Sequence, residues 1–170
     1  MFKKKAKDKI LDFILWRADR QFYEKELAQN TGVSKSMVNL IMVELVKKDW
    51  VKMEEKGRLN LFQANLKSIK VRNYKKDLVI EKLEPLVKYL KGKADKLILF
   101  GSAAKSEDLS ESDLDLAIVT KQQLETKKLL KFIPKDRKIQ LIIKTPDGFR
   151  ELRDKNKVLY RAILQGERLI

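Results

Sequence analysis

The stretch that most constrains this chain runs from residue 96 to 119, KLILFGSAAKSEDLSESDLDLAIV. An apolar run ends at Gly101-Ser102, and a second apolar run opens with Asp113 and Asp115. This pattern predicts two strands joined by a polar loop. Because side chains alternate along a strand, the two carboxylates are expected to point to the same side of it.

Two carboxylates held that close together are costly unless a cation lies between them. Oxygen ligands suit Mg²⁺, which usually takes one or two protein carboxylates together with the phosphates of a substrate. Glycine lets the backbone approach a ligand closely, and N–H groups at the start of a following helix favour an anion. The stretch therefore indicates a phosphate bound beside a metal ion.

The pattern Gly101-Ser102, ten residues, Asp113-Leu114-Asp115 resembles the minimal nucleotidyltransferases of the DNA polymerase beta superfamily. The resemblance implies that Gly101, Ser102 and Lys105 bind the phosphates of a nucleoside triphosphate, with Lys105 where the family often has an arginine. It also implies that Asp113 and Asp115 are the catalytic residues and bind Mg²⁺.

In that family a third carboxylate lies on a later strand, and the matching position in the apolar stretch KIQLIIK is Gln140. Glutamine is neutral and cannot accept a proton as a base. Phosphoryl transfer depends on positioning and on electrostatic stabilisation by metal, so an active transferase and a catalytically impaired one both remain open. The acids of the intervening loop, Glu107, Asp108 and Glu111, could supply a substitute metal ligand, but we expect them to be exposed loop acids.

Composition restricts the chemistry further. The chain has no cysteine and no histidine, which excludes disulfides, thiolate nucleophiles, the usual zinc sites and imidazole catalysis. The formal charge of +15 indicates attraction to polyanions such as nucleic acid or nucleotides, or else a lysine-rich surface that serves solubility. Composition alone does not decide between the two.

The sequence lacks a membrane signal. No run approaches the roughly 18 to 20 apolar residues that span a bilayer. The basic N-terminus is followed by an apolar run that contains Asp12 and lacks a small-residue cleavage site, so a signal peptide is not expected. We expect a cytoplasmic protein.

Residues 8 to 64 predict helices at 10–20, 24–29 and 35–47, followed by strands at 50–54 and 58–64. Asn30 to Gly32 is expected to end the second helix, and Ser34 to cap the third. This order of elements, and the segment ELAQNTGVSKSMVNLIMVELVKKDWV, resemble the winged helix-turn-helix family.

The winged-helix resemblance implies DNA as a partner. Lys35, Ser36 and Asn39, in the first turn of the third helix, would read the major groove. Lys56 and Arg58, in the wing, would meet phosphates.

Three apolar residues of the same helix, Leu40, Val43 and Val46, lie where a groove-facing helix tends to be polar. They indicate a homodimer contact or packing on the second domain. Winged helices also serve as protein-interaction modules, and in related minimal nucleotidyltransferases the partner is often a small helical toxin, so a protein partner stays open.

The rest of the chain predicts further helices and strands. A helical connector is expected over 66–90, ended or kinked at Pro85. A helix at 122–132 and a strand at 138–144 follow. The chain then predicts a helix from Pro146 to about Arg153, a helix over 157–165 and an edge strand at 169–170. A helix between two strands suggests a crossover and hence an α/β arrangement.

The predicted fold is a two-domain α+β and α/β protein. Its parts are a winged helix-turn-helix domain (1–65), a helical connector (66–95) and a nucleotidyltransferase domain (96–170) with a small mixed sheet flanked by helices. The predicted function is binding of a nucleoside triphosphate and Mg²⁺, with transfer of a nucleoside monophosphate to a protein or RNA hydroxyl. The alternative is a catalytically impaired DNA-binding regulator or antitoxin-like module that senses nucleotide or docks a partner protein.

Overall fold

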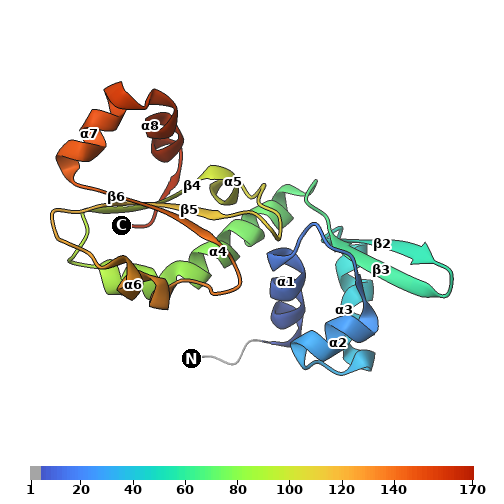
Figure 1. Cartoon of the computed structure of the whole chain (residues 1–170). Helices are drawn as coiled ribbons and strands as arrows, with labels where there is room; N and C mark the ends of the chain where they lie inside the picture. Colours follow the sequence, from blue (N-terminus) through green and yellow to red (C-terminus); the bar gives the residue numbers. More distant parts are fainter. Residues whose placement is uncertain (1–4) are drawn as a thin grey trace. The chain divides into compact units, whose positions relative to one another are not determined.

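The computed structural model describes residues 5–170, which form helices and two small sheets (Figure 1). The chain divides into two compact units, the first ending at Leu78 and the second spanning Val79–Ile170. The predicted division at residues 65 and 95 stays a prediction. Within residues 5–170, no helix combines the length and the hydrophobicity that a membrane-spanning segment needs.

Three helices and a small sheet form the first unit. The helices are α1 (Ala6–Trp16), α2 (Glu24–Thr31) and α3 (Lys35–Lys47). Strands β1 (Phe22–Tyr23), β2 (Val51–Lys56) and β3 (Leu59–Ala64) pair antiparallel in the order β1-β3-β2.

Local sequence explains where α2 ends and α3 begins. Gly32 ends α2 in the left-handed region, with φ of 67°, which glycine adopts without a steric penalty. The Ser34 hydroxyl oxygen accepts a hydrogen bond from the Met37 N–H at 3.4 Å and caps α3. The predicted inward positions Val38, Ile41 and Leu45 are buried.

The first helix differs from its predicted span of 10–20. It begins at Ala6, where Asp8 in the first turn favours a helix N-terminus. It ends at Trp16, because the chain must then extend to pair Phe22 with Phe62 across β1 and β3. The hairpin strands begin and end within two residues of the predicted bounds.

The connector helix is not ended at Pro85 as one prediction had it: α4 (Ile69–Leu90) continues through this proline. Proline inside a helix costs about 3 kcal/mol. Leu83, Leu86 and Leu90 flank it and are completely buried, and each such burial contributes about 1.5–3 kcal/mol. Burial on both sides of Pro85 therefore outweighs the cost of keeping it in the helix.

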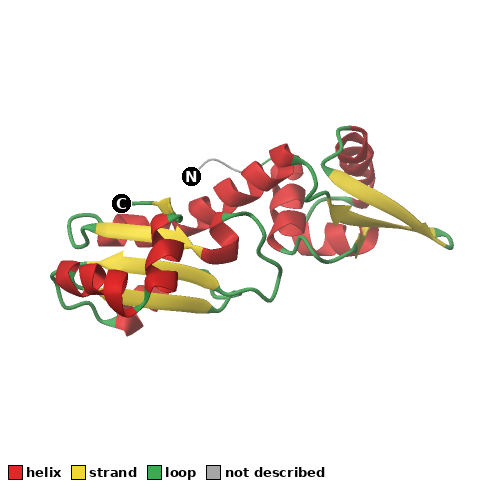
Figure 2. Cartoon of the chain, turned by 90° about the horizontal axis from the view of Figure 1, so that it is seen from above, coloured by secondary structure: helices red, strands yellow, loops and turns green. Residues whose placement is uncertain are grey.

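A four-stranded mixed sheet forms the second unit (Figure 2). Strand β4 (Lys96–Phe100) lies antiparallel to both β5 (Leu114–Val119) and β7 (Glu167–Arg168). Strand β6 (Ile139–Lys144) lies parallel to β5. The expected crossover and small mixed sheet are thus present, although the final strand forms at 167–168 rather than 169–170.

The crossover between β5 and β6 contains less helix than predicted. Only α6 (Thr126–Leu129) and the 3₁₀ turn η1 (Leu130–Phe132) form within the predicted span of 122–132. The Gln122 N–H donates to the Thr120 hydroxyl oxygen at 2.9 Å, and such side-chain turns compete with a helix.

Helices α7 (Pro146–Lys155) and α8 (Lys157–Leu164) cover one face of this sheet, and α6 and the part of α4 that belongs to the second unit lie on the other side (Figure 1). Side chains alternate along the strands, so Ile98 and Ala117 pack against Phe149 and Ile163, which belong to α7 and α8. The oppositely directed Leu99 and its neighbours fill the second layer of the core.

Candidate active site

Gly101 turns the chain directly after β4 and opens the short helix α5 (Gly101–Ala104). Its φ is 71°, a value that favours glycine. A Cβ atom at this position would overlap Oδ2 of Asp115 and lie 3.0 Å from its Cγ. Glycine is therefore required here both by the backbone conformation and by the carboxylate packed against it.

The two predicted aspartates meet this turn at the start of β5. Asp115 pairs with Phe100, the residue before Gly101, so the Gly101-Ser102 turn and the carboxylate lie at one end of the sheet. Asp113 is exposed and Asp115 is half-buried. Burial, and to a lesser extent the charge of Asp113, raise the pKa of the Asp115 carboxyl above its usual range.

Gln140 lies in β6 directly opposite Asp115 in the parallel register. Paired residues in neighbouring strands share a face of the sheet, so the Gln140 amide is placed beside the carboxylates. This is the face that α7 and α8 cover further along β5, because Asp115 alternates in step with Ala117. A neutral side chain therefore occupies the position from which a third carboxylate would reach this site.

Lys105 and Ser102 flank the same turn. The Lys105 N–H donates to the carbonyl oxygen of Ser102 at 3.1 Å, and Glu107 N–H donates to the same oxygen at 2.9 Å. The Lys105 side chain is exposed and forms no ion pair with any described residue. Both predicted phosphate-binding side chains thus lie on the turn next to Asp115.

The loop before Asp113 is anchored by a contact that the sequence did not reveal. Asp108 is completely buried, which corrects its assignment as an exposed loop acid, whereas Glu107 and Glu111 are exposed as expected. The Arg137 guanidinium donates to Asp108 Oδ2 at 3.0 Å, and the two side chains are 0% and 1% exposed. Burial of the pair explains the error, because a carboxylate inside a protein requires such a partner.

The Asp108–Arg137 pair joins two segments that carry site residues. Arg137 also donates to the carbonyl oxygen of Ser112 at 3.4 Å, next to Asp113. On the other side it lies two residues before β6, the strand that carries Gln140. The only signal in the sequence was an arginine ahead of the third strand, which does not by itself indicate its partner.

The donor set fits Mg²⁺. Across residues 5–170 no group of three or more His, Cys, Asp or Glu side chains is arranged to hold a metal. The available ligands are two carboxylates, Asp113 and Asp115, beside a neutral amide, and burial together with the charge of Asp113 raises the pKa of Asp115. Two carboxylates completed by substrate phosphates are a usual Mg²⁺ environment.

The predicted DNA-contacting residues lie in the first unit. Lys35 and Arg58 line one pocket of about 180 Å³ together with Lys25. Ser36, Asn39 and Lys56 are exposed but do not line it.

The apolar residues of α3 divide into two groups. Leu40 and Val43 are 69% and 64% exposed, and Val46 is half-buried. Leu40 and Val43 are available for a contact with another chain, and the homodimer contact and the protein partner stay predictions.

Comparison with known proteins gives one weak structural likeness. No curated protein sequence matches the chain. The crystal structure of adhesin competence repressor (AdcR) from Streptococcus pyogenes is similar with a TM-score of 0.40 and 16% sequence identity, covering 52% of this chain and 66% of that chain. A likeness this weak does not establish a shared fold.

The sequence model described as polymerase beta nucleotidyltransferase matches residues 81–170, more than half of the 170-residue chain. The match includes the whole mixed sheet, the Gly101-Ser102 turn and both aspartates. Members of this family typically use a nucleoside triphosphate and a divalent metal ion. The chain belongs to the polymerase beta nucleotidyltransferase family.

Proposed function

We propose that the second unit binds a nucleoside triphosphate with Mg²⁺ and transfers the nucleoside monophosphate to a hydroxyl group of an RNA or a protein. The observation that supports this most is the close approach of Gly101 to the Asp115 carboxylate. It brings a backbone turn suited to phosphate next to a carboxylate pair suited to metal.

Each site residue has a role in this proposal. Gly101 and the Ser102 hydroxyl contact the triphosphate, and the Lys105 ammonium neutralises part of its charge. Asp113 and Asp115 hold the metal, which supplies electrostatic stabilisation of the charge on the phosphates. Asp115 lies in β5 and Asp113 directly before it, so both would hold the metal at the end of the sheet that carries the Gly101-Ser102 turn.

The proposed transfer is a direct substitution at phosphorus. The acceptor oxygen forms a bond to the α-phosphorus while the bond from that phosphorus to the β-phosphate oxygen breaks. Pyrophosphate leaves with the electron pair, and the acceptor proton is released to solvent. The protein contributes positioning and charge stabilisation.

Gln140 limits the rate in this proposal. Its amide accepts a hydrogen bond through oxygen but carries no charge and takes no proton. Metal held by two carboxylates is bound less firmly than metal held by three, so transfer is slow compared with enzymes that have the third carboxylate. If Gln140 abolishes the transfer reaction completely, the second unit binds nucleotide without turnover and acts as a nucleotide sensor.

Calorimetric titration of Mg²⁺ and a nucleoside triphosphate into the full chain tests the site. Asp113→Asn removes one metal ligand, and binding is expected to weaken by about tenfold or more, the effect of about 1.4 kcal/mol. Glu111→Gln, which removes an exposed acid from the same loop, is the control and should leave binding unchanged. Equal binding by wild type and Asp113→Asn would contradict the assignment.

A second function is favoured by the pocket that Lys35 and Arg58 share. We propose that residues 8–64 are a winged helix-turn-helix that binds duplex DNA. Lys35, Ser36 and Asn39 read bases, while Lys56 and Arg58 contact phosphates. Titration of labelled duplex DNA into variants of equal net charge tests this.

A further inference from the structure

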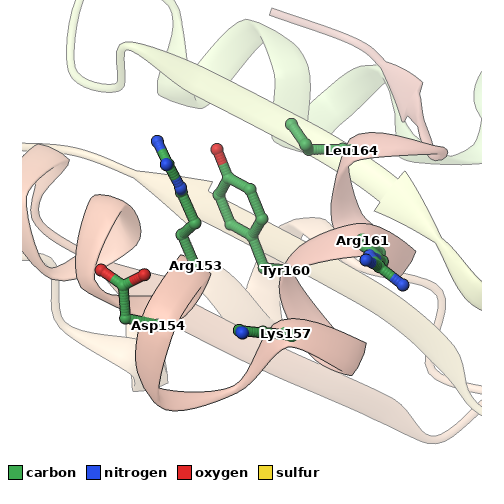
Figure 3. A pocket seen from close by; sticks show the side chains of 6 residues that line it. All are labelled: Arg153, Asp154, Lys157, Tyr160, Arg161 and Leu164. Atoms are coloured by element: carbon green, nitrogen blue, oxygen red, sulfur yellow. The ribbon is translucent and has the colours of Figure 1, made fainter.

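A basic pocket lies between α7 and α8 of the second unit and belongs to none of the sites described above. It has a volume of about 420 Å³. Figure 3 shows its lining side chains, and Arg153 and Tyr160 extend in the same direction from the two helices. The lining residues are Arg153, Asp154, Lys157, Tyr160, Arg161 and Leu164.

Three cations and one carboxylate line this pocket. Arg153, Lys157 and Arg161 are exposed and form no ion pair with another residue in the range 5–170. Only the carboxylate of Asp154 opposes these three charges within the lining. Three cations that line one pocket with a single carboxylate favour an anionic ligand.

Two other cations of α7 have carboxylate partners, unlike Arg153. Arg150 pairs with Asp147, and Lys155 pairs with Glu151 at 2.7 Å. The Glu151 carboxylate raises the pKa of Lys155, mainly through that hydrogen bond. Helix α7 therefore carries paired cations outside the pocket and an unpaired one, Arg153, inside it.

The pocket also presents an aromatic ring. Tyr160 is half-buried, and its ring packs against Phe149 with centroids 5.3 Å apart. Next to it Leu164 is 56% exposed. The Tyr160 ring is supported by Phe149 and lies among three cations without ion-pair partners. Proteins bind single-stranded nucleic acid with this combination, because bases stack on the ring and cations contact the phosphates.

The end of α8, the helix that carries Tyr160 and Arg161, packs against β4. Helix α8 is followed by Gly166, where a Cβ atom would lie 2.9 Å from the Cβ atom of Phe100. Phe100 immediately precedes Gly101 and pairs with Asp115. The C-terminal end of α8 therefore lies near the residue that precedes the Gly101-Ser102 turn.

We propose that the α7–α8 pocket binds a single-stranded polynucleotide, with Arg153, Lys157 and Arg161 on its phosphates and Tyr160 stacked on a base. Its role as the acceptor strand, whose terminal hydroxyl enters the active site, rests on the proposed transfer function. Strand binding itself does not. A duplex fits the pocket less well, because its bases are already stacked and cannot cover Tyr160.

The test is fluorescence anisotropy of labelled single strands of about 12 nucleotides, as RNA and as DNA, with the full chain. Arg153→Gln combined with Arg161→Gln should weaken binding about tenfold and lower the salt slope by about 1.4, since each single-strand phosphate contact contributes about 0.7. The control combines Arg150→Gln with Lys155→Gln, which removes the same charge from the paired cations and should change binding little.

Substitutions of Tyr160 test whether a base stacks on its ring. Tyr160→Leu should weaken binding about five- to hundredfold, whereas Tyr160→Phe keeps the ring and should bind as wild type does. Thermal unfolding of each variant separates loss of binding from loss of fold. All variants are also made together with Lys35→Gln and Arg58→Gln, so that DNA binding by the first unit does not mask the effect.

The outcomes separate this proposal from the transfer function. Equal weakening by the pocket and control pairs, or duplex bound better than single strands by the same residues, overturns the pocket assignment. Preference for RNA or for DNA identifies the polynucleotide. If the pocket variants lose strand binding while wild type shows no nucleotide binding in calorimetry, the strand site stands and the transferase proposal fails.

Discussion

The Asp115 carboxylate of the candidate active site lowers the stability of the folded protein when it is ionised. Burial and the neighbouring Asp113 charge raise the pKa of Asp115 in the folded protein. An acid whose pKa is higher when folded loses stability on ionisation. The penalty is absent at pH values below the pKa of the unfolded chain and is complete above the pKa of the folded protein.

This sign predicts a pH-dependent effect of Asp115→Asn in the absence of metal. The neutral side chain should increase the free energy of unfolding relative to wild type at neutral and alkaline pH. The gain should decrease as the pH falls through the folded pKa of Asp115 and disappear below the pKa of the unfolded chain, because the carboxyl is then neutral in both states. Urea denaturation across this pH range measures it.

Glu111→Gln provides the comparison for that experiment, since Glu111 is exposed in the same loop. It should show no comparable pH-dependent gain. A gain for Asp115→Asn that is the same at all pH values would mean that the charge of Asp115 does not oppose folding.

At the scale of elements, the loop between α5 and β5 is held by the buried Asp108–Arg137 pair. Removing one partner of a buried ion pair leaves an uncompensated charge, which costs about 3–5 kcal/mol. Asp108→Asn is therefore predicted to lower the free energy of unfolding by about that amount, as measured by chemical denaturation. Asp147→Asn breaks the exposed pair with Arg150 and should have little effect.

Replacing both partners gives a second check on this interpretation. Asp108→Leu with Arg137→Leu leaves no buried charge and should cost less than Asp108→Asn alone. If Asp108→Asn is no worse than Asp147→Asn, the pair does not hold the loop.

Elements governed by local signals were predictable. The span of α3 matched because Ser34 caps it and apolar residues follow at helical spacing. The Gly101 turn and the Asp113–Asp115 spacing were likewise visible in the sequence, and β4 and β5 formed around them. Such features depend on residues that are neighbours along the chain.

Features that depend on distant residues were missed. Continuation of α4 through Pro85 depends on buried partners of Leu83 and Leu86. Burial of Asp108 depends on Arg137, which is 29 residues away in the sequence. The unpaired state of Arg153 likewise becomes visible only when the partners of its neighbours are known.

The whole molecule carries a formal charge of +15, so it attracts any polyanion to some degree. Loss of any two cations weakens nucleic acid binding through the net charge alone. A specific surface is recognised only when its cations matter more than an equal number elsewhere. The nucleic acid affinities of two variants of this chain must therefore be compared at equal formal net charge.

Duplex DNA binding by the first unit is predicted on that basis. Lys35→Gln with Arg58→Gln and the control Lys9→Gln with Lys48→Gln each lower the formal charge from +15 by two. The first pair lines one pocket, whereas Lys9 lies on α1 and Lys48 pairs with Glu44 at 2.6 Å. Two duplex phosphate contacts contribute about 1.8 to the salt slope, so only the first variant should lose about that slope and about tenfold in affinity. Salt titration of labelled duplex measures both quantities, and equal losses in the two variants would leave net charge as the sole cause of binding.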